Sequence, residues 1–108
     1  MAYQHQSLAD GGWQALSLAE QLGNVGSEVS RAIKARGNEE RYWSALTRAF
    51  ELLDLTIADT RWKRRLKELT RTREVLGDAA MNGSEYHATL EDLDRYFFQF
   101  AMAARLSR

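Results

Sequence analysis

The feature that most constrains the fold is the absence of proline from all 108 residues. Proline usually occurs in loops and at helix starts, and it disrupts the interior of a helix. A chain without it, rich in Ala, Leu, Arg and Glu, favours long helices joined by short turns. With 44% apolar and 28% charged residues, the composition is typical of one globular domain with a single core.

Apolar residues recur at steps of three and four along four segments, which indicates amphipathic helices. The expected helices cover about residues 12–36, 39–58, 61–76 and 90–106. Residues 1–11 are largely polar and lead into the pair Gly11-Gly12, so they are expected to form an N-terminal tail, and residues 12–108 a single domain. The predicted fold class is all-α, an up-down-up-down four-helix bundle.

Local signals mark the ends of these helices. Gly37 occupies a C-terminal cap position, and Asn38 is a suitable N-cap for the second helix. Gly77 and the pair Asn82-Gly83 predict the end of the third helix and a loop after it. Thr89 and Asp92 resemble a capping box at the start of the fourth.

Composition also bears on the kind of function. The chain has no cysteine, which excludes disulfides, thiolate metal sites and a cysteine nucleophile. Formal net charge is zero, so any attraction to nucleic acid requires a local patch. No apolar run approaches the roughly 20 residues that span a bilayer, and the start lacks the features of a secretion signal. We expect a cytoplasmic protein with no membrane association, cofactor or metal.

One helix concentrates positive charge. Seven of the fifteen basic residues fall within residues 61–73. Six of them flank the apolar stripe of the third helix: Arg61, Lys63, Arg64, Arg65, Lys67 and Arg71. Such a cluster can neutralise phosphates of a nucleic acid, and arginine can stack on unpaired bases. The alternative is that Glu51, Asp54 and Asp59 compensate the charge through salt bridges between helices or between subunits.

The seventh basic residue, Arg73, lies between Leu69 and Leu76 within the apolar stripe of the third helix. A buried guanidinium requires a partner because an unpaired buried charge is too costly. Asp54 and Glu28 are the candidate partners. We expect a buried ion pair, Arg73 with Asp54 in the first place.

Two further sets of residues concern helix packing. Gly23, Gly26, Ser27 and Ser30 form a small-residue face that lets another helix approach closely, within the bundle or in an oligomer. Several large apolar residues fall outside the main stripes, and together they are a candidate interface for self-association. They are Trp13, Leu16, Leu52, Leu55, Phe98 and Met102.

Glu51 and Asp54 have the Glu-x-x-Asp spacing that places two carboxylates on one helical face, suitable for a divalent cation. This resembles half of the metal motif of all-α nucleotide pyrophosphatases of the MazG type. The earlier Glu-x-x-Glu half of that motif is missing, because Glu20 is followed by Gly23 and Glu28 by Arg31. A metal-dependent nucleotide hydrolase is therefore a third choice.

Segments 23–33, 37–38, 48–59, 65–76 and 96–105 together resemble a group of small uncharacterised prokaryotic four-helix proteins. The resemblance covers most of residues 20–106 and implies a compact prokaryotic bundle, with no activity attached to it. From the residues we expect a non-enzymatic protein-interaction or assembly module, a homo-oligomer or the partner of another protein. A nucleic-acid-binding accessory protein that uses the basic third helix is the alternative.

Overall fold

The computed structural model describes residues 12–107, and all regular secondary structure in this range is helical. Its elements are the 3-10 turn η2 (Trp13–Ala15), α1 (Leu18–Lys34), α2 (Glu39–Ala58), the 3-10 segment η3 (Thr60–Arg65), α3 (Leu66–Ala80) and α4 (Leu90–Leu106). The predicted all-α class with four α-helices is confirmed for these residues. The expected tail, residues 1–11, lies outside them, as does Arg108. Within residues 12–107, none of the helices has both the length and the apolar content that crossing a bilayer requires.

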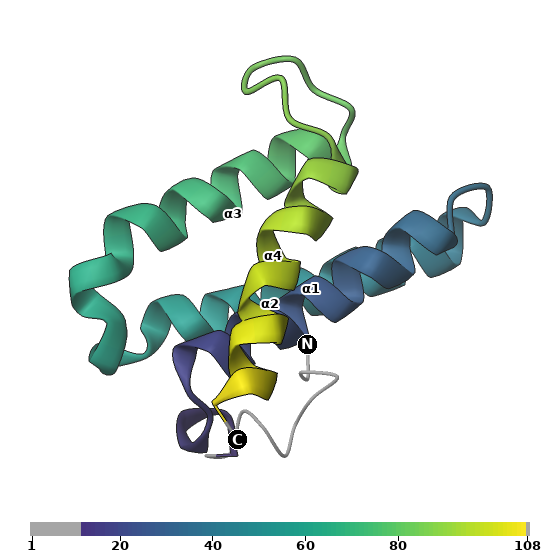
Figure 1. The fold of residues 1–108 in the computed structure, drawn as a ribbon. Coiled ribbons are helices and arrows are strands. Elements are labelled where there is room, and N and C mark those ends of the chain that lie inside the picture. Colours follow the sequence, from purple (N-terminus) through teal and green to yellow (C-terminus); the bar gives the residue numbers. More distant parts are fainter. Residues whose placement is uncertain (1–11, 108) are drawn as a thin grey trace.

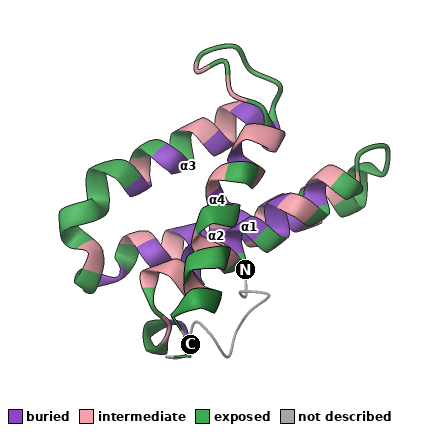
Figure 2. Cartoon of the chain, in the orientation of Figure 1, coloured by how far each residue is buried: buried purple, intermediate pink, exposed green. Residues whose placement is uncertain are grey.

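The four α-helices are arranged unequally. Figure 1 shows α1 and α2 as an antiparallel pair, with α4 crossing α1 and α3 set apart on the side of α2. Helix α1 contacts both α2 and α4 extensively, whereas α3 makes fewer contacts, with α2, η3 and α4. The largest fully buried side chains come from η2 and all four α-helices, among them Trp13, Leu22, Leu46, Leu76 and Phe97. Figure 2 shows that η3 and the outer side of α3 are mostly exposed.

Two capping boxes begin α1 and α4. Ser17 and Glu20 exchange side-chain to backbone hydrogen bonds of 3.1 and 2.9 Å at the start of α1. Thr89 and Asp92 do the same at the start of α4, as predicted. The expectation that the first helix starts near residue 12 was wrong, because Ser17 satisfies the first backbone N–H groups and separates α1 from η2.

The turn between α1 and α2 has the predicted geometry. Gly37 adopts a φ of +95°, in the left-handed region that glycine enters without steric penalty. The side chain of Asn38 accepts a hydrogen bond from the backbone N–H of Arg41, which caps α2. Helix α2 has the predicted bounds, Glu39–Ala58.

The third helix begins and ends later than predicted. Asp59 caps a 3-10 segment, and the α-helical part starts only at Leu66. The helix passes through Gly77 and ends where Asn82 adopts a φ of +54°. The N–H groups of Asn82 and Gly83 then donate to the carbonyl oxygens of Ala79 and Asp78, at 3.1 and 2.8 Å. This is a Schellman motif, in which asparagine replaces the usual glycine.

The small-residue face of α1 allows α4 to approach closely. A Cβ atom on Gly26 would lie 2.5 Å from Cβ of Phe97, and one on Gly23 would lie 3.1 Å from Cα of Ala101. Real Cβ contacts are longer than the first of these distances. Packing within the bundle, one of the two expected uses of this face, is therefore confirmed for Gly23 and Gly26.

Candidate interaction surfaces

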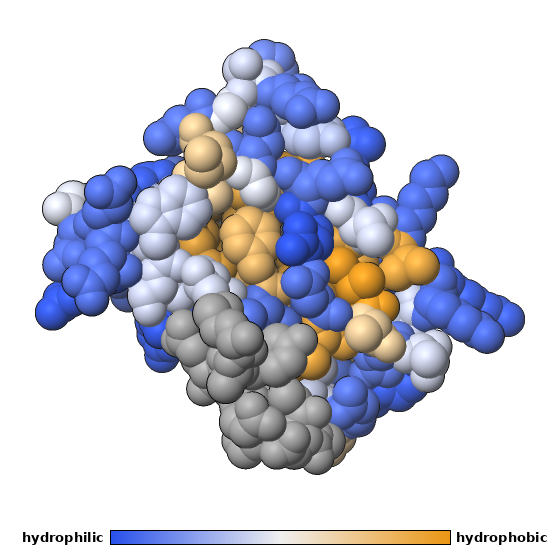
Figure 3. Space-filling view, turned by 180° about the vertical axis from the view of Figure 1, so that it is seen from behind, coloured by the Kyte–Doolittle hydropathy of each residue, from blue (hydrophilic) through white to orange (hydrophobic). Residues whose placement is uncertain are grey.

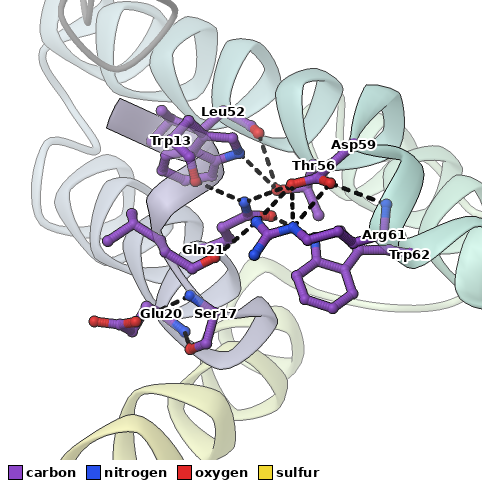
Figure 4. Close-up of polar contacts among 10 residues, drawn as sticks. Trp13, Ser17, Glu20, Gln21, Leu52, Thr56, Asp59, Arg61 and Trp62 are labelled. Carbon is purple, nitrogen blue, oxygen red and sulfur yellow. Dashed lines mark hydrogen bonds and ion pairs between the residues drawn. The ribbon is translucent and has the colours of Figure 1, made fainter. Parts of the chain in front are cut away.

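A buried polar cluster joins η2, α1, α2 and η3 (Figure 4). The amide of Gln21 donates to the carbonyl oxygen of Trp13 at 2.9 Å and to Oδ2 of Asp59 at 3.1 Å. The Trp13 indole N–H donates to Oγ1 of Thr56 at 3.3 Å, and that of Trp62 donates to Oε1 of Gln21 at 3.0 Å. Gln21, Thr56 and Asp59 are all buried. The cluster ties the N-terminal turn to the corner between α2 and η3.

Arg61 belongs to this cluster. Its Nη2 lies 2.7 Å from Oδ2 of Asp59 and donates to the carbonyl oxygen of Leu16 at 2.8 Å. Hydrogen bonds from the Arg61 side chain lower the pKa of Asp59 from 3.8 to about 2, against the opposing effect of burial. The guanidinium also lies 4.4 Å from the centre of the Trp62 ring. Arg61, one of the residues expected to contact nucleic acid, closes the corner between α2 and η3.

The other five residues of the expected nucleic-acid site differ in their surroundings. Arg65 pairs with Glu68 at 2.9 Å, and the guanidinium of Arg71 lies 4.9 Å from the centre of the Tyr86 ring. The remaining three are exposed and form no ion pair with any residue in the range 12–107: Lys63, Arg64 and Lys67. The basic segment therefore divides into side chains with partners and a smaller cluster open to solvent.

The predicted pairing of Arg73 with Asp54 is present, but it is not buried. Nε of Arg73 lies 2.6 Å from Oδ1 of Asp54, and the two side chains are 45% and 46% exposed. The buried face of α3 includes Thr72 in place of Arg73, so Arg73 lies at the edge of that face. Glu28, the other candidate partner, is bonded to Arg31 and Arg48.

The six residues of the expected interface fall into three groups. Trp13 and Leu52 are buried in the core, so they contribute to no surface of the described chain, and their assignment to an interface is corrected. Leu16 and Leu55 are partly buried against that core. Only Phe98, 58% exposed, and Met102, 36% exposed, present substantial apolar surface. Trp13 fits the core because its indole N–H has a partner there.

Phe98 and Met102 belong to a longer exposed stripe on α4. Leu106 follows Met102 by four residues and is 82% exposed. Residues four apart lie on one side of a helix, so the three side chains form a continuous row. The opposite side of α4 carries the buried residues Leu93 and Phe97. The sequence spacing could have identified Leu106, which the expected interface omitted.

Apolar surface also occurs on α2 and α3. Trp43 and Leu66 are 37% and 41% exposed. On the face turned away from the viewer in Figure 1, apolar residues are interrupted by strongly hydrophilic ones (Figure 3). The guanidinium of Arg73 lies 5.2 Å from the centre of the Phe50 ring and covers part of it. Hydrophilic side chains thus divide the apolar residues of this face.

The two carboxylates of the metal hypothesis lie in different surroundings. Glu51 is buried, whereas Asp54 is half-exposed and bonded to Arg73. In the described part of the chain, no group of three or more His, Asp or Glu side chains is arranged to hold a metal ion.

Comparison with protein-family models found no match, and neither did comparisons with curated proteins and with solved structures.

Proposed function

We propose that this chain is a non-enzymatic protein-interaction module that self-associates through α4. The observation that carries the proposal is the exposed row of Phe98, Met102 and Leu106. A helix with one apolar side in its own core and a second apolar side in solvent is typical of a helix that meets a partner. Aromatic residues and methionine are enriched in protein interfaces.

A second copy is the partner that this row fits. Two copies of one helix can pair antiparallel about a two-fold axis, so that the same surface is used twice. With the axis at Met102, Phe98 of one copy lies opposite Leu106 of the other. Arg105 then lies opposite Gln99, so no like charges face each other across the axis.

The alternatives have less support. A nucleic-acid site on η3 and α3 would retain Lys63, Arg64 and Lys67, while Arg61 and Arg65 are held by carboxylates. A hydrolase centred on Glu51 and Asp54 would have to release Asp54 from Arg73. The up-down-up-down order, the cytoplasmic location and the prokaryotic origin remain parts of the proposal; the antiparallel α1–α2 pair supports the first of them.

The test is the molar mass in solution, measured by light scattering after size exclusion. The proposal predicts a mass of about twice 12.4 kDa for the wild-type chain. Phe98→Asp should reduce the mass to that of a monomer, because it places a carboxylate in the centre of an apolar contact. Leu66→Asp is the matched control: Leu66 is an exposed leucine on α3, and its replacement should leave the dimer intact. A monomeric wild-type chain, or equal effects of the two variants, would contradict the proposal.

A further inference from the structure

A cleft lined by basic side chains lies where α1 ends and α2 begins. It encloses about 550 Å³. Five basic residues line it: Arg31, Lys34, Arg36, Arg41 and Arg48. The other lining residues are small or polar, and none of the lining residues is Asp or Glu. In the sequence these five residues are spread over 18 positions of α1, the turn after it and α2, so they form no charge run.

A buried carboxylate organises two of the five. Glu28, whose side chain is 3% exposed, accepts a hydrogen bond from Nη1 of Arg31 at 2.9 Å. Its other oxygen accepts from Nε of Arg48 at 3.2 Å. Nη1 of Arg48 also donates to Oγ of Ser44 at 3.0 Å. Guanidinium groups that are held in this way lose less freedom when they bind an anion.

The cleft retains an excess of positive charge. Arg36 pairs with Glu91, and Glu28 serves both Arg31 and Arg48. Lys34 and Arg41 are exposed and form no ion pair with any described residue. Lys34 and Arg41 therefore leave an excess of positive charge in one concave surface, where it acts on an anion.

The basic side chains of the cleft are spread over a distance greater than the size of a single phosphate group. Arg41 and Arg48 are seven residues apart, which corresponds to about 10 Å along α2. Arg31 and Lys34 line the facing side on α1. A row of cations on both walls of an open cleft matches a series of phosphates along a strand.

We propose that this cleft binds the phosphodiester backbone of a single-stranded nucleic acid. The lining argues against an anionic membrane surface as the ligand. Binding to a membrane interface usually inserts large apolar side chains, and this cleft has only Ala35 and Ala45 as apolar lining residues. The site is distinct from the cluster of Lys63, Arg64 and Lys67 on η3 and α3, and from the stripe of α4.

The experiment compares two charge reversals of equal size. Binding of a fluorescein-labelled single-stranded oligouridine is followed by anisotropy at low salt. Lys34→Glu with Arg41→Glu should weaken binding by at least tenfold, because both side chains face the cleft and each change replaces attraction by repulsion. Arg64→Glu with Lys67→Glu changes the net charge equally at the other basic cluster and should have a much smaller effect. Circular dichroism melts show whether both double variants remain folded.

The salt dependence gives a second readout. For single strands, the slope of log K against log salt is about −0.7 per phosphate contacted, so Lys34→Ala with Arg41→Ala should reduce its magnitude by about 1.4. The proposal is overturned if the two double reversals weaken binding equally, or if the wild-type chain does not bind the oligonucleotide at low salt. It is also overturned if the wild-type chain binds phosphatidylserine vesicles in preference to the oligonucleotide.

Discussion

Gly26 of α1 and Phe97 of α4 are in such close contact that a Cβ atom on Gly26 would lie 2.5 Å from Cβ of Phe97. Both residues are buried. The atom that the added Cβ would meet is Cβ of Phe97, and a change of the Phe97 rotamer does not move its Cβ. The separation of α1 and α4 is therefore limited by the absence of a side chain at position 26.

Gly26→Ala should destabilise the fold, because α4 must move away from α1 to admit the methyl group. We expect a loss of about 1–3 kcal/mol in the free energy of unfolding, measured by urea denaturation. Gly77→Ala is the matched control: Gly77 lies within α3, and nothing lies within 4 Å of its added Cβ. That variant should gain about 0.5–1 kcal/mol from helix propensity. Equal effects of the two substitutions would contradict the close approach of α4.

Asp59 should make the fold sensitive to acid. Its pKa is lowered to about 2 in the folded chain from 3.8, so its contribution to stability is present above pH 3.8 and is lost as the pH falls towards 2. The shift corresponds to about 2 kcal/mol.

Asp59→Asn removes this contribution. Urea denaturation at a series of pH values should show the variant less stable near neutral pH and closer to the wild type near pH 2, because only the wild type loses the contribution on acidification. Glu91 and Asp92 also have lowered pKa values, from hydrogen bonds to Arg36 and to Thr89 respectively, and they act alike in both proteins. If the difference in the free energy of unfolding between the wild type and Asp59→Asn does not change with pH, the ionised Asp59 is not the source of the acid sensitivity.

The ion pair between Arg73 and Asp54 and the ion pairs of Glu28 should contribute unequally to the free energy of unfolding. The Arg73–Asp54 pair is half-exposed, so Arg73→Met should change the free energy of unfolding by less than about 1 kcal/mol. Glu28 is buried beneath Arg31 and Arg48, so Glu28→Gln should lose about 1–3 kcal/mol. Urea denaturation of the two variants under the same conditions measures both losses in the free energy of unfolding. A larger loss for Arg73→Met than for Glu28→Gln would contradict this prediction.

Local signals predicted some elements well. The starts of α2 and α4 followed from Asn38 and from the Thr89–Asp92 box, because a cap depends on residues within one turn. The start of α1 was missed although Ser17 and Glu20 have the spacing of a capping box. Trp13 and Leu16 fall outside the apolar stripe of the expected first helix, and they lie in η2 and at its C-terminal end, before α1 begins.

Other features depended on contacts between distant residues. Gly77 has the residue type of a helix end, but burial of Ala79 and Ala80 favours continuation of α3 to the Asn82 cap. The choice of Asp54 over Glu28 for Arg73 was correct, whereas burial of the pair was wrong, because the buried face of α3 runs through Leu69, Thr72 and Leu76 and leaves Arg73 at its edge. The Gln21 cluster joins positions up to 45 residues apart and has no sequence signature.

The most direct test of self-association through α4 uses the absence of cysteine from the chain, since a single introduced thiol can then react only with its copy in another molecule. With the two-fold axis at Met102, Met102→Cys should form an intermolecular disulfide under mild oxidation, seen as a dimer on a non-reducing gel. Leu66→Cys, on the exposed side of α3, is the control for random collision. Efficient cross-linking at position 102 alone is the predicted result, and cross-linking no greater than that at position 66 would contradict the proposed dimer.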